Sequence, residues 1–143
     1  MKRHKSLILL SSDHHNGLAI AQKLKYGYKP SSSKESIPDV KEKKEMLLDF
    51  FRDHLQIHFE KEEKILAPYF TANELMDRMI EEHIRIYEMI FEIDMNKPDN
   101  DKLNEFGEML EAHIRFEERQ LFPMIEESLT EEQLEEIEKK MKS

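Results

Sequence analysis

Apolar residues recur at intervals of three and four along most of the chain, and no segment alternates with the two-residue period of a strand. This spacing predicts four long helices, at about residues 12–26, 39–68, 73–95 and 100–127. Thr130 and Gln133 form a capping box for a short amphipathic fifth helix at about residues 131–142. The pattern therefore predicts an all-α protein.

The connections between the helices indicate how they pack. Gly27 and the Pro30-Ser31-Ser32-Ser33 stretch predict one long irregular connection after the first helix, whose N-cap we expect at Ser11 or Ser12. The later connections are short, and four helices joined in this way pack most simply as an antiparallel up-down four-helix bundle. We expect a single domain of residues 1–143, with the C-terminal helix across one end of the bundle.

The composition excludes several classes of function. The formal net charge of −9 argues against nucleic-acid binding, which needs a basic surface. The chain has no cysteine, and therefore no disulfide, thiolate metal site or cysteine nucleophile. Its apolar run Leu7–Leu10 is too short for a secretory signal, and no stretch reaches the length of a membrane span. We therefore expect a cytoplasmic protein that makes no membrane contact.

One eleven-residue pattern occurs twice, 55 residues apart. From His58 the chain reads HFEKEEKILAP, and from His113 it reads HIRFEERQLFP. Each copy has a histidine, a glutamate four residues later, a second glutamate beside it, and a proline ten residues after the histidine. We expect these prolines, Pro68 and Pro123, to end or kink their helices, because each lacks a backbone donor and clashes with the preceding turn.

The apolar stripes show which polar residues face the core, because positions four residues apart share one face of a helix. Each long helix directs one histidine inward, and the two helices with the repeated pattern add one glutamate each. These residues are His14, His58, Glu62, His83, His113 and Glu117. Glu63 and Glu118 are rotated away from the core, and we expect their replacement by Gln to have little effect.

Two inward glutamates need compensating positive charge, because burying an unpaired carboxylate is costly. The inner faces carry no lysine or arginine that could supply it. A pair of metal ions, bridged by Glu62 and Glu117 and coordinated by neutral imidazoles, would do so. Nitrogen and oxygen ligands without sulfur suit iron, manganese or zinc. The Glu-x-x-His spacing of ferritin-like di-iron bundles is absent from the sequence.

The chain resembles the hemerythrin-like (HHE cation-binding) family, whose pattern over four successive helices is H, H-x-x-x-E, H and H-x-x-x-E. The matching residues are His14, His58 with Glu62, His83, and His113 with Glu117. The resemblance extends from about Leu10 to Glu127. It implies an antiparallel four-helix bundle that holds two iron ions, bridged by two carboxylates and an oxo or hydroxo group. Zinc or manganese could take the place of iron.

The sequence departs from the oxygen-carrying members of that family in two places. On the third helix it has Tyr87 where they carry a second histidine. On the fourth helix they use an aspartate five residues after the histidine, a position that is Glu118 here. His54, Tyr87 and His15 are candidates for an additional ligand or for a contact to a ligand, although for Tyr87 we favour core packing.

Members of the family bind O2 reversibly, sense oxygen or redox state, or handle iron, nitric oxide or peroxide. The resemblance therefore implies a non-haem di-iron protein whose partner is a small diatomic ligand or oxidant, and we favour a binding or sensing role over an enzymatic one. Two alternatives stay open. One is a metal-dependent peroxidase or ferroxidase, and the other is a regulatory interaction module stabilised by metal. The sequence indicates no protein partner.

Overall fold

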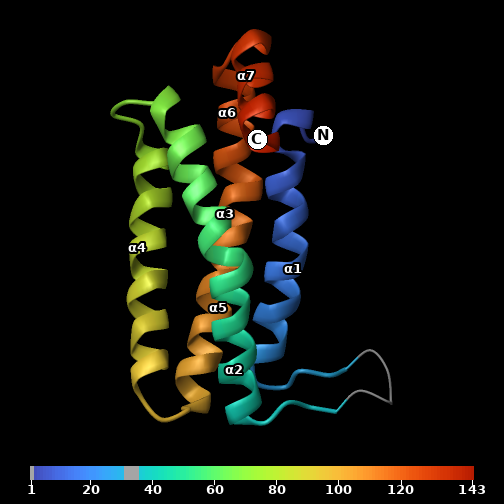
Figure 1. Cartoon of the computed structure of the whole chain (residues 1–143), viewed down its shortest axis with the longest axis vertical. Helices are drawn as coiled ribbons and strands as arrows, with labels where there is room; N and C mark the ends of the chain where they lie inside the picture. Colours follow the sequence, from blue (N-terminus) through green and yellow to red (C-terminus); the bar gives the residue numbers. More distant parts are fainter. Residues whose placement is uncertain (1, 31–35) are drawn as a thin grey trace.

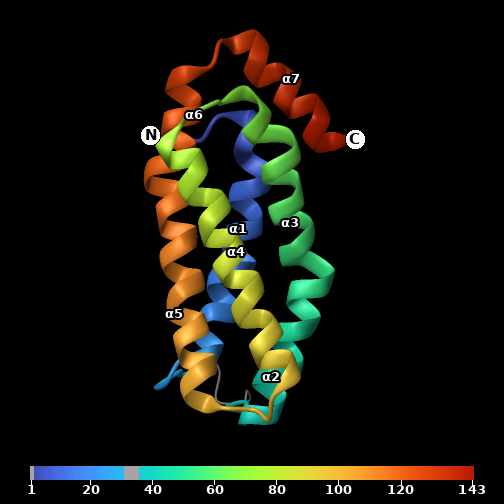
Figure 2. The same ribbon diagram turned by 90° about the vertical axis from the view of Figure 1, so that its left-hand side faces the viewer.

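The computed structural model describes residues 2–30 and 36–143, and within these ranges every regular element is a helix. Four long helical rods run side by side, alternating in direction, and a shorter helix lies across one end (Figures 1 and 2). The prediction of an all-α bundle is confirmed. Part of the long connection after the first helix, residues 31–35, lies outside the described residues.

Six of the seven α-helices in the described residues build the rods, together with the short segments between them, and the seventh lies across the end (Figure 2). In chain order the α-helices of the described residues are α1 (Ile8–Leu24), α2 (Val40–Phe50), α3 (Gln56–Lys61), α4 (Glu74–Met95), α5 (Asn100–Phe116), α6 (Phe122–Ser128) and α7 (Glu131–Lys142). The second rod continues from α2 into α3, and the fourth from α5 into α6, through π-helical segments. The capping box predicted at Thr130 and Gln133 is present at the start of α7.

The first helix begins earlier than the sequence predicted. Ser11 and Ser12 lie inside α1, so the expected cap at these residues is wrong. A short 3₁₀ turn precedes α1, and the side chain of His4 caps it by accepting a hydrogen bond from the backbone N–H of Ser6. Because Leu7 and Leu10 are buried, apolar packing extends the helix beyond its polar capping candidates.

The repeated sequence pattern produces a repeated backbone feature. The π-helical segments Glu62–Leu66 and Glu117–Leu121 each begin at the first glutamate of the pattern and end two residues before its proline. Pro68 lies in a 3₁₀ turn that ends the second rod, as expected, whereas α6 continues past Pro123. Pro123 lies in the first turn of α6, directly after the π-helical segment Glu117–Leu121.

Two glycines allow α1 and α5 to approach each other closely. A Cβ atom on Gly107 would lie 2.7 Å from the backbone oxygen of Ala21. A Cβ atom on Gly17 would lie 2.8 Å from Cδ1 of Ile114, the flexible end of a side chain. The contact at Gly107 is therefore the more restrictive of the two.

The core consists of two apolar clusters, and polar residues lie between them along each rod. One cluster includes Leu24, Leu47, Phe59, Ile86 and Phe106. The other includes Leu10, Leu66, Met79, Phe122 and Ile137, so α7 closes the bundle at that end. None of the described helices combines the length and apolar character needed to cross a bilayer.

Candidate metal centre

Six polar side chains meet between the two apolar clusters, and each is at most 5% exposed. They form two groups whose nitrogen and oxygen atoms lie within 4.8 Å of one another. The first group is His14, His58, Glu62 and Glu117, and the second is Glu62, His83, His113 and Glu117. Glu62 and Glu117 belong to both groups. The structure therefore brings together all six residues that the sequence indicated as inward-facing.

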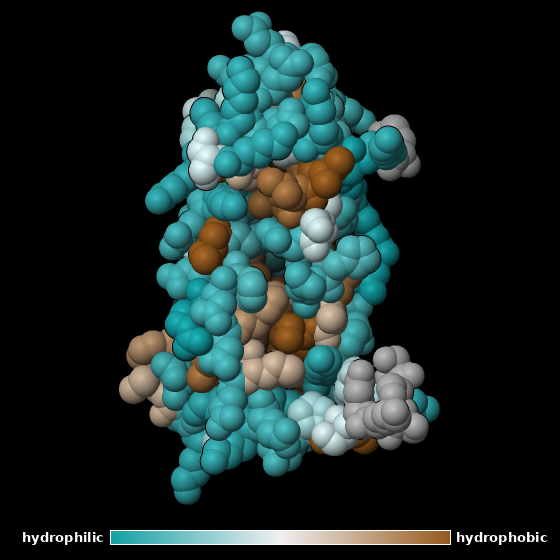
Figure 3. Space-filling model, turned by 45° about the vertical axis from the view of Figure 1, so that its right-hand side comes forward, coloured by the Kyte–Doolittle hydropathy of each residue, from teal (hydrophilic) through white to brown (hydrophobic). Residues whose placement is uncertain are grey.

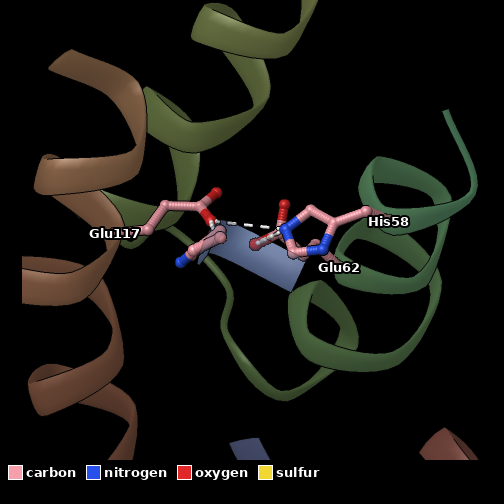
Figure 4. Close-up of side chains that lie close together, drawn as sticks. His58, Glu62 and Glu117 are labelled. Carbon is pink, nitrogen blue, oxygen red and sulfur yellow. Dashed lines mark hydrogen bonds and ion pairs between the residues drawn. The ribbon is translucent and has the colours of Figure 1, made fainter. Parts of the chain in front are cut away.

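The two shared glutamates come from opposite rods and point toward each other (Figure 4). Nε2 of His58 lies 3.3 Å from Glu62 and 3.8 Å from Glu117. Nε2 of His83 also reaches both carboxylates, at 3.1 Å from Glu62 and 3.6 Å from Glu117. His14 and His113 each direct Nε2 to Glu117, at 2.9 Å. All four imidazoles thus present the same nitrogen to one pair of carboxylates.

Most of these inward-facing atoms have no hydrogen-bond partner among residues 2–30 and 36–143. The atoms without a hydrogen bond, although some lie within ion-pair distance of one another, are Nε2 of His58, His83 and His113, both carboxylate oxygens of Glu62, and Oε2 of Glu117. A buried polar atom without a partner costs about 1–3 kcal/mol, and more when it is charged. Six such atoms converging on one small volume fit a bound cation, and nitrogen with oxygen donors is the ligand set of the transition metals named above.

The positive charge that the carboxylates need does not come from lysine or arginine. Every ion pair that Glu62 and Glu117 form with a described residue involves a histidine. The expectation that the inner faces carry no lysine or arginine is wrong at Lys43, which is buried in α2. Lys43 donates to the side chain of Asn100, at 2.8 Å, and takes no part in the two groups.

The opposite nitrogen of each imidazole, Nδ1, contacts a second set of carboxylates. His14 contacts Glu118 at 2.6 Å, and His58 contacts Asp13 at 3.1 Å. His83 contacts Glu63 at 2.8 Å, and His113 contacts Glu82 at 2.7 Å. We call Asp13, Glu63, Glu82 and Glu118 the outer carboxylates. Each is partly solvent-exposed, and none belongs to the two inner groups.

A family model described as the hemerythrin HHE cation binding domain matches residues 9–125. This match covers most of the chain. The chain belongs to the hemerythrin HHE cation-binding family. Comparisons with curated proteins and with solved structures found no match. Membership of the HHE family and the two groups of histidine and glutamate in the structure together indicate metal binding.

Part of this HHE site is not predicted from the sequence. Helical periodicity places Glu63 and Glu118 away from the core, but both touch a buried histidine from outside. Asp13 and Glu82 are not among the predicted site residues. A signal for them exists in the sequence, because each directly precedes an inward histidine. A residue adjacent to an inward position is rotated by about 100° and so lies on the flank of the helix, where it can reach the neighbouring helix.

Without a cation, protons balance the charge of the HHE site. Burial would lower the pKa of His14, but its hydrogen bonds with Glu117 and Glu118 outweigh that effect and raise the pKa to about 9. Burial likewise opposes charge on His83, yet its contacts with Glu117 and Glu62 raise its pKa to about 10. Burial would raise the pKa of Glu118, whereas the hydrogen bonds from His14 and Ser11 lower it to about 2. The metal-free site therefore holds protonated imidazoles beside ionised carboxylates.

The three additional candidates lie outside the two inner groups. His15 and His54 are exposed, so the first-helix residue that joins the site is His14. The ring of Tyr87 packs edge-on against Phe51 and Phe59, with centroids 5.4 and 5.8 Å apart. Burial, together with the nearby charges of the glutamates at 60, 62 and 63, raises the pKa of Tyr87 to about 12. This environment favours a neutral phenol that packs in the core.

Aromatic rings and a small cavity surround the inner groups. Phe59 stacks on His83 with centroids 3.9 Å apart, and Phe122 stacks on His14 at 5.5 Å. A cavity of about 20 Å³ lies against His14, His58 and His113. Its other lining residues include Gly17, Phe50, His54, Phe59 and Ile114. Figure 3 brings the α1 side of the molecule forward and shows hydrophobic side chains in the middle of an otherwise hydrophilic face.

Proposed function

We propose that this HHE domain holds two iron ions, bridged by Glu62 and Glu117, and that it binds or senses a small oxidant such as O2, nitric oxide or peroxide. The observation that carries the proposal is the sharing of both glutamates by the two inner groups. Neither group contains all six residues, whereas two ions that share two carboxylates use all of them. His14 and His58 would hold one ion, and His83 and His113 the other.

The donor set supports iron. Two imidazoles with carboxylates, and no sulfur, are the ligands that non-haem iron proteins use when a coordination position stays open for a substrate. A di-iron pair supplies reversible one-electron chemistry and an open position at which a diatomic ligand or oxidant can bind. The chain itself provides the two bridging carboxylates, the imidazoles and the apolar rings that exclude water from them.

The cavity supports a small partner molecule. A volume of about 20 Å³ accepts roughly one water-sized molecule, since a water needs about 10–15 Å³ measured in the same way. It touches His14 and His58, which face one ion, and it has Leu55, Phe59 and Ile114 among its walls. A diatomic molecule or peroxide is small enough for this space.

The test is to produce the protein with iron, measure iron per chain, and record the visible spectrum with and without air. We expect two irons per chain and a spectrum that changes on exposure to O2, nitric oxide or peroxide. One iron per chain, or zinc retained in preference to iron, would contradict the proposal. Sustained turnover of peroxide or Fe(II) would show an enzyme, and a metal-loaded protein that responds to none of these ligands would favour a metal-stabilised interaction module.

A further inference from the structure

The four outer carboxylates form a closed circuit around the bundle. Asp13 of α1 contacts His58 of α3, and Glu63, just after α3, contacts His83 of α4. Glu82 of α4 contacts His113 of α5, and Glu118, just after α5, contacts His14 of α1. Each rod therefore supplies the carboxylate that holds the histidine of the next rod, and the fourth rod returns to the first.

These contacts fix the chemical form of the imidazoles. An ionised carboxylate only accepts hydrogen bonds, so Nδ1 of each histidine must donate to it. In the neutral imidazole that binds a metal, the Nδ1–H bond leaves the lone pair on Nε2, and that atom points toward Glu62 or Glu117 in all four cases. The circuit thus prepares four identical nitrogen donors, each aimed at the same small volume.

Two of the outer carboxylates are themselves held from outside by arginine. Arg3 lies 3.1 Å from Glu118, and its second guanidinium nitrogen lies 2.6 Å from Glu126. Arg78 donates to Glu82 at 2.8 Å, and its guanidinium lies 4.1 Å from the centre of the Phe116 ring. Glu82 and Glu118 are therefore clamped between an arginine and a histidine. Asp13 is the most exposed of the four, at 55%, and its contact with His58 is the longest.

We propose that Asp13, Glu63, Glu82 and Glu118 act together as positioning residues that aim the four imidazoles at the metal pair and favour its more highly charged, oxidised state. This inference rests on the proposed di-iron centre. A carboxylate that accepts the Nδ1–H bond makes the imidazole a stronger donor through Nε2, and its negative charge stabilises the ion of higher charge. The clamped residues, Glu82 and Glu118, contribute most to positioning, because each is held from both sides, and they serve one ion each.

The experiment separates positioning from charge by comparing two substitutions at each clamped residue. Glu82→Gln keeps an oxygen that accepts the bond from His113 but removes the charge, whereas Glu82→Ala removes both. Glu118→Gln and Glu118→Ala make the same comparison at His14. Glu81→Gln is the matched control, because Glu81 is exposed and neighbours Glu82. Far-ultraviolet circular dichroism of each metal-free variant verifies that the bundle has folded.

Two measurements on these variants give distinct outcomes. We expect each Ala variant to lose about ten- to hundredfold in affinity for Zn²⁺, an ion that undergoes no redox change. Each Gln variant should keep affinity within a few-fold of the unmodified protein. At a fixed applied potential, the ratio of oxidised to reduced iron in each Gln variant should be several-fold lower than in the unmodified protein. Glu81→Gln should change neither quantity.

The inference and the proposed function fail in different ways. If the unmodified protein does not take up two irons per chain, the proposed function is wrong. If it does, but the Ala variants at Glu82 and Glu118 bind Zn²⁺ as tightly as it does, the outer carboxylates are not positioning residues. If the ratio of oxidised to reduced iron is unchanged in both Gln variants, the charge of the outer carboxylates does not favour the oxidised state. If the variants at one of these two residues fail to fold, the variants at the other residue provide the test.

Discussion

Glu62 and Glu63 contact the two opposite ring nitrogens of the same imidazole, that of His83. Glu62 lies 3.1 Å from Nε2 of His83, and Glu63 lies 2.8 Å from Nδ1 of that ring. In the second copy of the pattern, Glu117 and Glu118 lie 2.9 and 2.6 Å from the two nitrogens of His14. The doubled glutamate thus provides one carboxylate for the inner groups and one for the outer circuit, which explains why both residues recur.

Removal of one shared carboxylate should affect both ions. Glu117→Gln takes away a charge that contacts His14, His58, His83 and His113 and that belongs to both inner groups. We expect the iron content of the purified protein to fall from two per chain to less than one. Glu60→Gln, at an exposed position on the same rod as Glu62, should leave the content unchanged. Equal losses in the two variants would contradict the bridging role.

Tyr87 should not be needed for metal binding. Its ring packs against Phe51 and Phe59, and Tyr87→Phe keeps both contacts. We expect the variant to retain two irons per chain, with its free energy of unfolding within about 1 kcal/mol of the unmodified protein. Loss of one iron, or of an absorption band assigned to a phenolate, would show that Tyr87 is a ligand.

The metal-free protein should lose stability as the pH rises. His14 and His83 have pKa values of about 9 and 10 in the folded protein, against 6.5 for an ordinary histidine. A raised pKa means that the folded state binds the extra proton, so its contribution is full below pH 6.5 and disappears as the pH passes through 9 to 10. Urea unfolding in the presence of a chelator should show this decline.

The metal-loaded protein provides the control for that measurement. Cations and protons compete for the same imidazole nitrogens, so the stability conferred by metal should grow as the pH rises through this interval. Metal-free stability that is constant between pH 6.5 and pH 10 would mean that the histidine–glutamate contacts do not hold protons. A decline of equal size in the loaded protein would mean that the cations do not replace them.

The close contact between α1 and α5 should make Gly107 sensitive to a single methyl group. Alanine is favoured over glycine within a helix by roughly 0.5–1 kcal/mol. At Gly107, however, the methyl group would meet the backbone oxygen of Ala21 at 2.7 Å, which the helices can relieve only by moving apart. We expect Gly107→Ala to destabilise the fold by about 1–3 kcal/mol in urea unfolding.

Gly17→Ala is the matched comparison for that prediction. Its methyl group would meet only Cδ1 of Ile114, which can rotate away. Its destabilisation should be smaller than that of Gly107→Ala, and the helical preference of alanine offsets part of it. A Gly107→Ala variant at least as stable as the unmodified protein would show that the two helices are less closely fixed than described.

The sequence predicted the helices and the six inner residues because both depend on a single physical rule, the periodic burial of one helix face. His58 and Glu62 could be assigned to the core because they share the stripe of Leu55 and Leu66. The start of α1 at Ile8 was missed because tertiary packing of Leu7 and Leu10 overrides the polar capping signals at Ser11 and Ser12.

The outer carboxylates could not be assigned in the same way. Asp13 and Glu82 lie on the flanks of their helices, where a side chain faces either solvent or the neighbouring rod. Which of these occurs depends on the order and spacing of the helices around the bundle, and helical periodicity does not contain that information. Helical periodicity does not predict the π-helical segments either, although both copies of the repeated pattern contain one.

The central claim is that a pair of cations balances Glu62 and Glu117, and crystallography of the iron-loaded protein with anomalous scattering at the iron edge tests it most directly. The account predicts two separate anomalous peaks, both within coordination distance of the two carboxylates, one beside His14 and His58 and the other beside His83 and His113. One peak, or two glutamates bonded only to protonated histidines with no peak between them, would contradict it.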